Sequence, residues 1–236
     1  TIRVDGRLDE SGWLGATRIG PLTQTLPVEG VEMTRDTDVR VTYDRDTVYV
    51  GITCYDDPKE IRARQMERDA FVRFDDVVEL WFDPFASDRF AYWFQVTPAG
   101  SLGDALIADN GASFNKDWDG IWYGEVQRTP QGGTAELAFP VKTLSFDPDA
   151  PYWGFNITRQ RIANGERGRW ASPSVAYPFF QVSDGGKLTG IDGLRQGVGL
   201  DVVPYVKFDA ERQDADSSFD SAWDAGLDLR WRPTPA

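Results

Sequence analysis

Two tryptophans, a glutamate and a glutamine are spaced within residues 75–98 so that they could meet on one surface. The alternation in DDVVELWFD places Glu79 and Trp81 on the same face of a predicted strand, because successive side chains of a strand point to opposite faces. If the chain then turns back symmetrically, the return strand brings Trp93 opposite Trp81 and Gln95 opposite Glu79. Aromatic rings pack on the C–H faces of sugars, and carboxylates and amides bind the ring hydroxyls. This face is therefore a candidate ligand site, and the alternative is that another segment or a partner packs over it.

Three further tryptophans lie in or next to predicted loops. Trp118 and Trp122, in DWDGIWYG, share a face if that segment is extended, and Trp170 lies in ERGRWASP. Loop aromatics beside carboxylates suit a sugar subsite, because loops on a rigid scaffold often carry binding residues. The alternative for all three is that they anchor the protein core.

Acidic residues occur in pairs, of which Asp56–Asp57 and Asp75–Asp76 precede or follow predicted strands. Calcium binds six to eight oxygen ligands from carboxylates and carbonyls on loops, so these four residues are candidate metal ligands. None of them has the spacing of a defined calcium loop.

The composition excludes several classes of function. The net charge of −13 over 236 residues argues against a nucleic acid partner. The chain has no histidine, which excludes Ser-His-Asp catalysis and His-ligated zinc or haem. We expect no haem, since a Met–Lys pair built on Met33 or Met66 is the only ligation left. The single cysteine, Cys54, reads as a buried thiol. Paired carboxylates could serve a glycosidase, but no local motif supports catalysis, and we predict that the protein is not an enzyme.

Short alternating segments separated by turn residues dominate the chain and predict an all-β fold, a β-sandwich. The predicted strands cover residues 38–43, 47–54, 77–83, 90–97, 120–128, 134–139 and 152–159. Helical pattern is scarce: residues 58–68 (PKEIRARQMER) are expected to form one short helix, and residues 140–144 a further turn.

The pattern changes near residue 193. Residues 199–208 (GLDVVPYVKF) and 223–231 (WDAGLDLRW) alternate apolar and polar side chains around a polar, acidic loop. Nine residues with an aromatic at each end match a strand that crosses an outer membrane, although an ordinary sandwich strand alternates in the same way. Two strands cannot close a barrel, so on the membrane interpretation the remaining strands lie beyond this sequence. The chain opens without a basic region followed by an apolar one, and we expect no signal peptide within it.

The succession of segments also resembles a known family. The segments are IRVDGRLDESGW, TDVRVTYDRDTVYVGITCYDDP, RDAFVRFDDVVELWFDPFASDRFAYWFQVTPAG, WDGIWYGEV, AELAFPVKTLSF, YWGFNITRQ and GKLTGIDGL. They resemble bacterial outer-membrane proteins in which a domain similar to family 9 carbohydrate-binding modules precedes a large β-barrel. The resemblance implies a jelly-roll-type sandwich over residues 1–193, followed by the first barrel strands over 194–236. It also implies a location in the outer membrane, with the sandwich periplasmic or surface-exposed.

The resemblance also implies a ligand. Modules of this type hold the end of a sugar chain against tryptophan faces, with polar side chains around the ring and calcium supporting the loops. This chain has Phe71, Arg73 and Phe74 where such a ring would lie just ahead of DDVVE. The partners that the resemblance implies are a glycan or oligosaccharide and the protein's own barrel. The alternative is a structural or interaction module that docks on or gates the barrel and binds no sugar.

Overall fold

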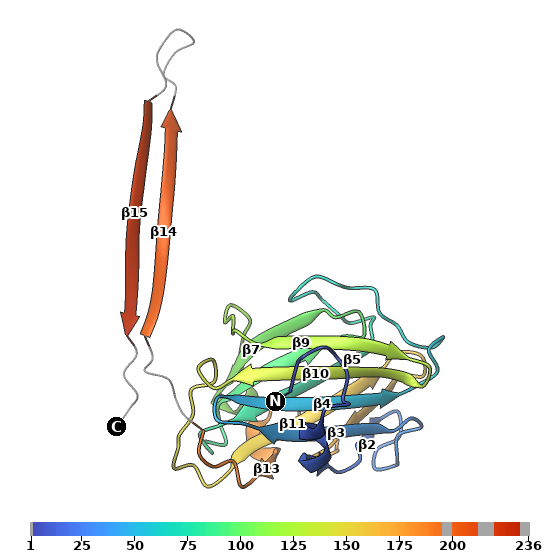
Figure 1. The fold of residues 1–236 in the computed structure, drawn as a ribbon. Helices are drawn as coiled ribbons and strands as arrows, with labels where there is room; N and C mark the ends of the chain where they lie inside the picture. Colours follow the sequence, from blue (N-terminus) through green and yellow to red (C-terminus); the bar gives the residue numbers. More distant parts are fainter. Residues whose placement is uncertain (1, 195–199, 212–219, 232–236) are drawn as a thin grey trace. The chain divides into compact units, whose positions relative to one another are not determined.

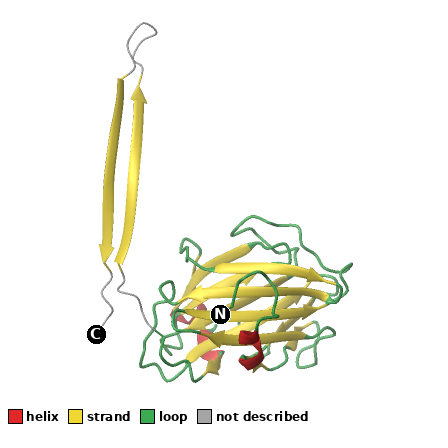
Figure 2. Ribbon diagram, viewed as in Figure 1, coloured by secondary structure: helices red, strands yellow, loops and turns green. Residues whose placement is uncertain are grey.

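The computed structural model describes residues 2–194, 200–211 and 220–231. The chain divides into two compact units, Thr1–Arg195 and Gln196–Ala236. Strands make up most of the regular structure (Figure 2). The described segments contain three short 3-10 helices, η1 (Ser11–Gly15), η2 (Asp109–Gly111) and η3 (Val182–Asp184). None of the helices in these segments is long and apolar enough to cross a membrane.

The first unit is a sandwich of two antiparallel sheets, seen as stacked layers in Figure 1. Sheet A has the order β1 (Thr17–Ile19), β3 (Thr37–Tyr43), β4 (Thr47–Tyr55), β10 (Gly132–Pro140), β9 (Tyr123–Thr129). Sheet B has the order β2 (Thr23–Leu26), β12 (Glu166–Arg169), β11 (Trp153–Arg161), β5 (Val77–Asp83), β6 (Ala91–Val96), β7 (Leu102–Ala108), β8 (Ser113–Asn115). A short strand, β13 (Gly186–Leu188), also pairs with β11. The all-β sandwich predicted from the alternating segments is confirmed.

The main core lies between the two sheets. Alternation sends β-branched and aromatic side chains inward from both layers, where they bury apolar surface against each other. The Phe82 ring of sheet B meets the Phe139 ring of sheet A at 5.3 Å between centroids, and both side chains are fully buried. The core therefore joins β5 to β10 directly across the sandwich.

The N-terminal segment covers the outer face of sheet A. Trp13, in η1, packs with Tyr49 and Ala138, two outward-facing residues of β4 and β10. The Trp13 indole Nε1 donates to the Glu136 carboxylate at 3.1 Å, and Glu136 also accepts from the backbone N–H of Asp5 at 2.8 Å. A fully buried carboxylate thus fastens the first residues to the sandwich.

The expected helix over residues 58–68 is wrong, and this segment runs without regular structure after a turn. Its backbone N–H groups are bound by side chains instead of by helical carbonyls. The Asp76 carboxylate accepts from the N–H of Arg62, and the Asp75 carboxylate accepts from those of Arg64 and Gln65. A carboxylate that accepts these hydrogen bonds offers the backbone an alternative to a helix.

The second unit contains a two-stranded antiparallel sheet of β14 (Leu200–Glu211) and β15 (Asp220–Trp231). The strands predicted at 199–208 and 223–231 are therefore present. Their register places Val206 opposite Ala225 and Phe208 opposite Trp223, so apolar residues of both strands share one face. Most of the acidic loop between them, residues 212–219, lies outside the described residues.

Candidate functional site

The outer face of sheet B carries a row of polar residues that crosses five strands. Glu79 of β5 lies between Thr158 of β11 and Gln95 of β6, and the row continues to Arg169 of β12 and ends on the other side at Gly103 of β7, which has no side chain. The predicted pairing of Glu79 with Gln95 and of Trp81 with Trp93 is confirmed by this register.

The two tryptophans of this face are not open to solvent. Trp81 is 0% exposed and Trp93 is 3% exposed. The segment after β12 crosses the sheet here, and its residues Phe179, Phe180 and Val182 form one apolar cluster with the two rings. A ring that is covered on its face offers no platform for a sugar. The alternative prediction, in which another segment covers this face, is therefore the correct one for Trp81 and Trp93.

Four buried N–H groups near the row have no hydrogen-bond partner among the described residues. They are the Trp93 Nε1, Gln95 Nε2, Arg167 Nε and Arg169 Nε atoms. Buried donors are normally paired with protein, water or ligand, so these four N–H groups are available to bind water or a ligand. Glu79, which is half-buried, lies beside these donors, and the Trp93 indole stabilises its carboxylate.

The charge of Glu79 is affected by its neighbours in and around this row. Burial raises the pKa of the Glu79 carboxyl, and the charges of Arg167, Arg169 and Lys116, together with the Trp93 indole, oppose this rise. The Lys116 ammonium lies 5.9 Å from the centre of the Trp93 ring. The face therefore offers one acceptor surrounded by donors and cations.

A loop over residues 62–76 borders the row at its β7 end. The backbone N–H of Asp69 donates to the Leu102 carbonyl at 2.8 Å, and the Asp69 carboxylate accepts from the N–H of Asp104. A side chain at Gly103 would lie within 3.3 Å of the Asp69 carboxylate and 3.0 Å of the Gln95 amide, so these two groups meet over the glycine. The same loop carries the phenyl rings of Phe71 and Phe74, which are 76% and 64% exposed.

Trp118 and Trp122 are core anchors, not open sugar platforms. The Trp122 ring stacks on Phe139 at 5.4 Å, and its Nε1 donates to the buried Asp104 carboxylate at 2.7 Å. The half-buried Trp118 packs against Tyr92 with ring centroids 5.1 Å apart. Of the two predictions weighed for this pair, the anchoring role matches their packing.

Trp170 lies on the inward side of sheet B, away from the polar row. Its ring packs on Phe155 at 5.7 Å, at the margin of the main core. It is half-buried and lines a cleft at the edge of the sandwich. The structure therefore separates Trp170 from Glu79, with which it was grouped as a candidate.

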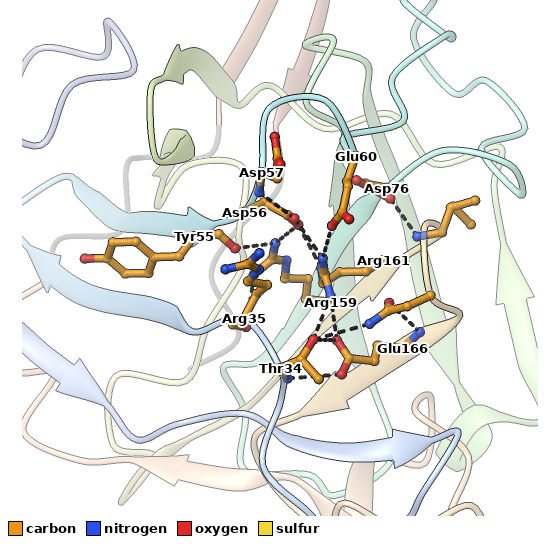
Figure 3. A network of polar contacts seen from close by, with 12 residues as sticks. Thr34, Arg35, Tyr55, Asp56, Asp57, Glu60, Asp76, Arg159, Arg161 and Glu166 are labelled. Carbon is orange, nitrogen blue, oxygen red and sulfur yellow. Dashed lines mark hydrogen bonds and ion pairs between the residues drawn. The ribbon is translucent and has the colours of Figure 1, made fainter.

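Asp56 belongs to a buried ion-pair network between the sheets and the 56–62 segment (Figure 3). Its carboxylate accepts from Arg161 at 2.7 Å through both oxygens and from Arg159 at 2.7 Å. Arg161 also pairs with Glu166 at 2.8 Å. Burial alone would raise the pKa of Asp56, but the hydrogen bonds from Arg161 and the charge of Arg159 outweigh it and lower that pKa.

The four acidic residues proposed as calcium ligands do not fit a calcium site. Both oxygens of Asp56 face arginine cations, and Asp57 is exposed beside it. Asp75 and Asp76 are buried and accept backbone N–H groups, which directs those oxygens away from a shared cation. The described residues contain no group of three or more acidic, histidine or cysteine side chains arranged for a metal ion.

Arg167 and Arg169 were missed by the sequence reasoning, although a signal was present. In ERGRW the two arginines alternate with Glu166 and Gly168, which is the pattern of a strand with one cationic face. The stretch is shorter than the other predicted strands, and its residues are therefore predicted to lie in a loop. Lys116, outside any predicted strand, offered no such signal.

Comparison with solved structures shows that neighbouring folds are family 9 carbohydrate-binding modules. One is such a module from Caldicellulosiruptor kristjanssonii in complex with cellotriose, at 14% identity and a TM-score of 0.58, covering 80% of this chain and 89% of that chain. The corresponding glucose complex covers 84% of this chain and 93% of that chain, also at 14% identity and a TM-score of 0.58. A provisionally assigned carbohydrate-binding protein of Bacteroides uniformis gives a TM-score of 0.60 at 14% identity, covering 75% and 87%. No family model matches the chain, and no curated protein matches it.

Proposed function

We propose that the first unit is a non-catalytic carbohydrate-binding domain and that the row around Glu79 on sheet B holds the glycan. The observation that carries this proposal is the group of four unpaired buried donors beside one half-buried carboxylate. A sugar hydroxyl both donates and accepts, so a pyranose edge could donate to Glu79 and accept from Gln95 and Trp93. The sandwich fold of sugar-binding neighbours supports the same class of ligand.

Exposed aromatic residues at the rim supply the stacking that the buried tryptophans do not. Phe71 and Phe74 project from the 62–76 loop, and Tyr177, on the covering segment, is 46% exposed. Aromatic rings with one free face are the groups that pack on sugar C–H surfaces. In this proposal Trp93 contributes its N–H group and Trp81 supports the floor, while Trp118 and Trp122 act only through the core.

The test is a titration of the full chain with a panel of oligosaccharides, followed by calorimetry and tryptophan fluorescence. We expect saturable binding that falls roughly ten- to hundredfold in Glu79→Gln, because a hydrogen bond to a charged group is worth about 1.5–3 kcal/mol. The matched control is Glu125→Gln, an exposed glutamate on β9 of sheet A, which leaves affinity unchanged. Flat traces across the panel with a folded protein would reject the proposal.

An interaction module without a sugar ligand is the second candidate. It is favoured by the covering segment, which buries Trp81 and Trp93 and leaves Val175 and Tyr177 exposed on its own outer side. Exposed apolar side chains beside a closed face suit contact with protein. A flat glycan titration would support this candidate.

We further propose that β14 and β15 are the first strands of an outer-membrane barrel, with the sandwich in the periplasm or at the cell surface. The register supports this, because it gathers Pro204, Val206 and Phe208 with Ala225, Leu227 and Trp223 on one apolar face. The exposed fractions of Phe208 and Trp223 are 53% and 73%, and their rings lie 4.6 Å apart. An apolar outer face with paired aromatics is the pattern of a strand in contact with lipid.

A further inference from the structure

A cleft of about 310 Å³ opens at the edge of the sandwich, on the inward side of sheet B and away from the Glu79 row. Sheet A lines it with residues of β1 and β3, and the other wall is formed by Trp170 and residues 187–191. Small-molecule sites have volumes of roughly 300–1,000 Å³, so the cleft has room for a single sugar-sized ring.

Polar groups without partners face this cleft. The Trp170 indole Nε1 donates to none of the described residues and lies 3.7 Å from where a side-chain carbon at Gly20 would be. Thr17 is opposite Val41 in the sheet register and therefore points to the same, inward side, and its hydroxyl makes no hydrogen bond with the described residues. Ile19 and Leu188 supply an apolar floor.

The two walls of the cleft are joined to each other by hydrogen bonds. The Tyr43 hydroxyl donates to the Gly190 carbonyl at 2.7 Å and accepts from the N–H of Asp192 at 3.2 Å. These two bonds tie the segment after β13 to the edge of sheet A. Trp170 is held on its own side by Gly186, where any side chain would overlap the indole ring.

The charges on the rim of the cleft are already engaged. Arg18 pairs with Asp38 at 2.6 Å on the outer side of sheet A, and the Lys187 ammonium lies 4.1 Å from the centre of the Tyr152 ring. No acidic residue is among those that line the cleft. An uncharged ligand is therefore favoured over an anion or a cation.

We propose that this cleft is a second binding site, separate from the Glu79 row, for one uncharged pyranose ring. The indole of Trp170 offers a surface for the C–H face of the ring and an N–H donor for a ring oxygen. Thr17 offers a hydroxyl that can donate or accept. The site would give the domain two separate contacts with a glycan, and it does not depend on the row around Glu79 being a sugar site.

The experiment is a titration of the full chain, labelled with ¹⁵N, followed through the indole N–H signals of its tryptophans. The Trp170 signal is assigned by its loss in Trp170→Phe. The probes are D-glucose, D-galactose, D-mannose and N-acetylglucosamine, each to about 50 mM to reach weak affinities, with D-glucuronate as the charged comparison. We expect at least one neutral sugar to shift the Trp170 signal saturably, and to do so equally in Glu79→Gln.

A pair of threonine variants tests the cleft without disturbing the core. Thr17→Val removes the hydroxyl at nearly constant volume and weakens the Trp170 response roughly two- to tenfold, the value of one neutral hydrogen bond. Thr53→Val is the matched control, since Thr53 lies on β4 and makes no side-chain hydrogen bond with the described residues. The proposal is overturned if no neutral sugar moves the Trp170 signal in the folded chain. It is equally overturned if Glu79→Gln abolishes the shift, if glucuronate binds as well, or if Thr17→Val has no effect.

Discussion

The indole Nε1 of Trp81 donates a hydrogen bond of 2.9 Å to the backbone carbonyl of Phe179. This contact fixes the segment after β12 across the outer face of sheet B, where Phe179 is itself 8% exposed. A side chain of β5 therefore determines which part of that face a ligand can reach. The Trp81 end is closed, and the Glu79 end retains its unpaired donors.

Removing the Phe179 ring should open the closed end. We expect Phe179→Ala to lower the free energy of unfolding by about 3 kcal/mol, the cost of truncating a buried phenylalanine. It should also shift tryptophan emission to longer wavelength and increase quenching by acrylamide, because the Trp81 and Trp93 rings become exposed. Phe71→Ala is the matched control at a 76% exposed ring and should change neither quantity. Unchanged emission in Phe179→Ala would show that the covering segment holds without this ring.

The buried carboxylate of Asp56 should be essential for stability. Asp56→Asn leaves Arg159 and Arg161 buried without their shared partner, and we expect a loss of about 3–5 kcal/mol in urea denaturation. The neighbouring exposed residue gives the control, since Asp57→Asn should stay within about 0.5 kcal/mol of the unchanged protein. Equal effects of the two substitutions would contradict the role of the network.

Stability should pass through a maximum in mildly acidic solution. Burial raises the pKa of five carboxyls, so the folded chain holds their protons more tightly than the unfolded chain, and stability falls as pH rises through that window. These residues are Asp76, Glu79, Asp83, Asp104 and Glu136. Asp56 and Glu166 have pKa values lowered from 3.8 and 4.5 despite burial, because arginine and other hydrogen-bond donors bind their carboxylates, so their contribution is lost as pH falls below those values.

Melting temperatures measured from pH 3 to pH 8 should therefore rise as pH falls from neutrality and drop below about pH 4. Asp56→Asn should flatten the acidic limb, because this variant has no Asp56 carboxylate left to protonate. A melting temperature that climbs steadily from pH 4 to pH 8 would show that the five carboxyls with raised pKa do not determine the pH dependence in this range.

Calcium should not stabilise the chain through the four carboxylates that were candidate ligands. Asp56 is bound by arginines, and Asp75 accepts the backbone N–H groups of Arg64 and Gln65. We expect the same melting temperature in calcium and in a chelator. A rise with calcium that disappears in Asp75→Asn would place a metal at this loop after all.

The apolar face of the β14–β15 hairpin should bind lipid. We expect the full chain to associate with phospholipid vesicles in a flotation assay, and Val206→Asp to reduce this by weakening the apolar face. Val203→Asp is the matched control. Val203 lies on the other face of β14, opposite Asp228 of β15. If the two variants behave alike, the hairpin does not use one face for lipid.

Local pattern was enough to predict the hairpin of sheet B. Alternation fixed which residues of β5 share a face, and a short turn fixed the register that pairs Glu79 with Gln95. The same reasoning failed at residues 58–68, because their helical pattern competes with the carboxylates of Asp75 and Asp76, which lie at least ten residues further along the chain.

Burial of the candidate site could not be predicted from the strands alone. Whether Trp81 is open depends on Phe179, 98 residues away, and no periodicity within β5 encodes that contact. Likewise, Asp56 resembles a calcium ligand in the sequence, but in the structure Arg161, 105 residues later, donates hydrogen bonds to both of its oxygens. A residue type fixes what chemistry is available, and distant packing decides whether that chemistry is used.

The order in which sheet B is assembled has a consequence for how the protein is made. β5 can pair with β11 only after about seventy further residues have been synthesised, and β2 can pair only once β12 has been synthesised. A nascent chain that ends before Trp153 therefore exposes unpaired strand edges, which are templates for pairing with another copy. Pairings between such distant strands also slow folding. We expect newly made chains to depend on a chaperone until nearly the whole first unit has emerged.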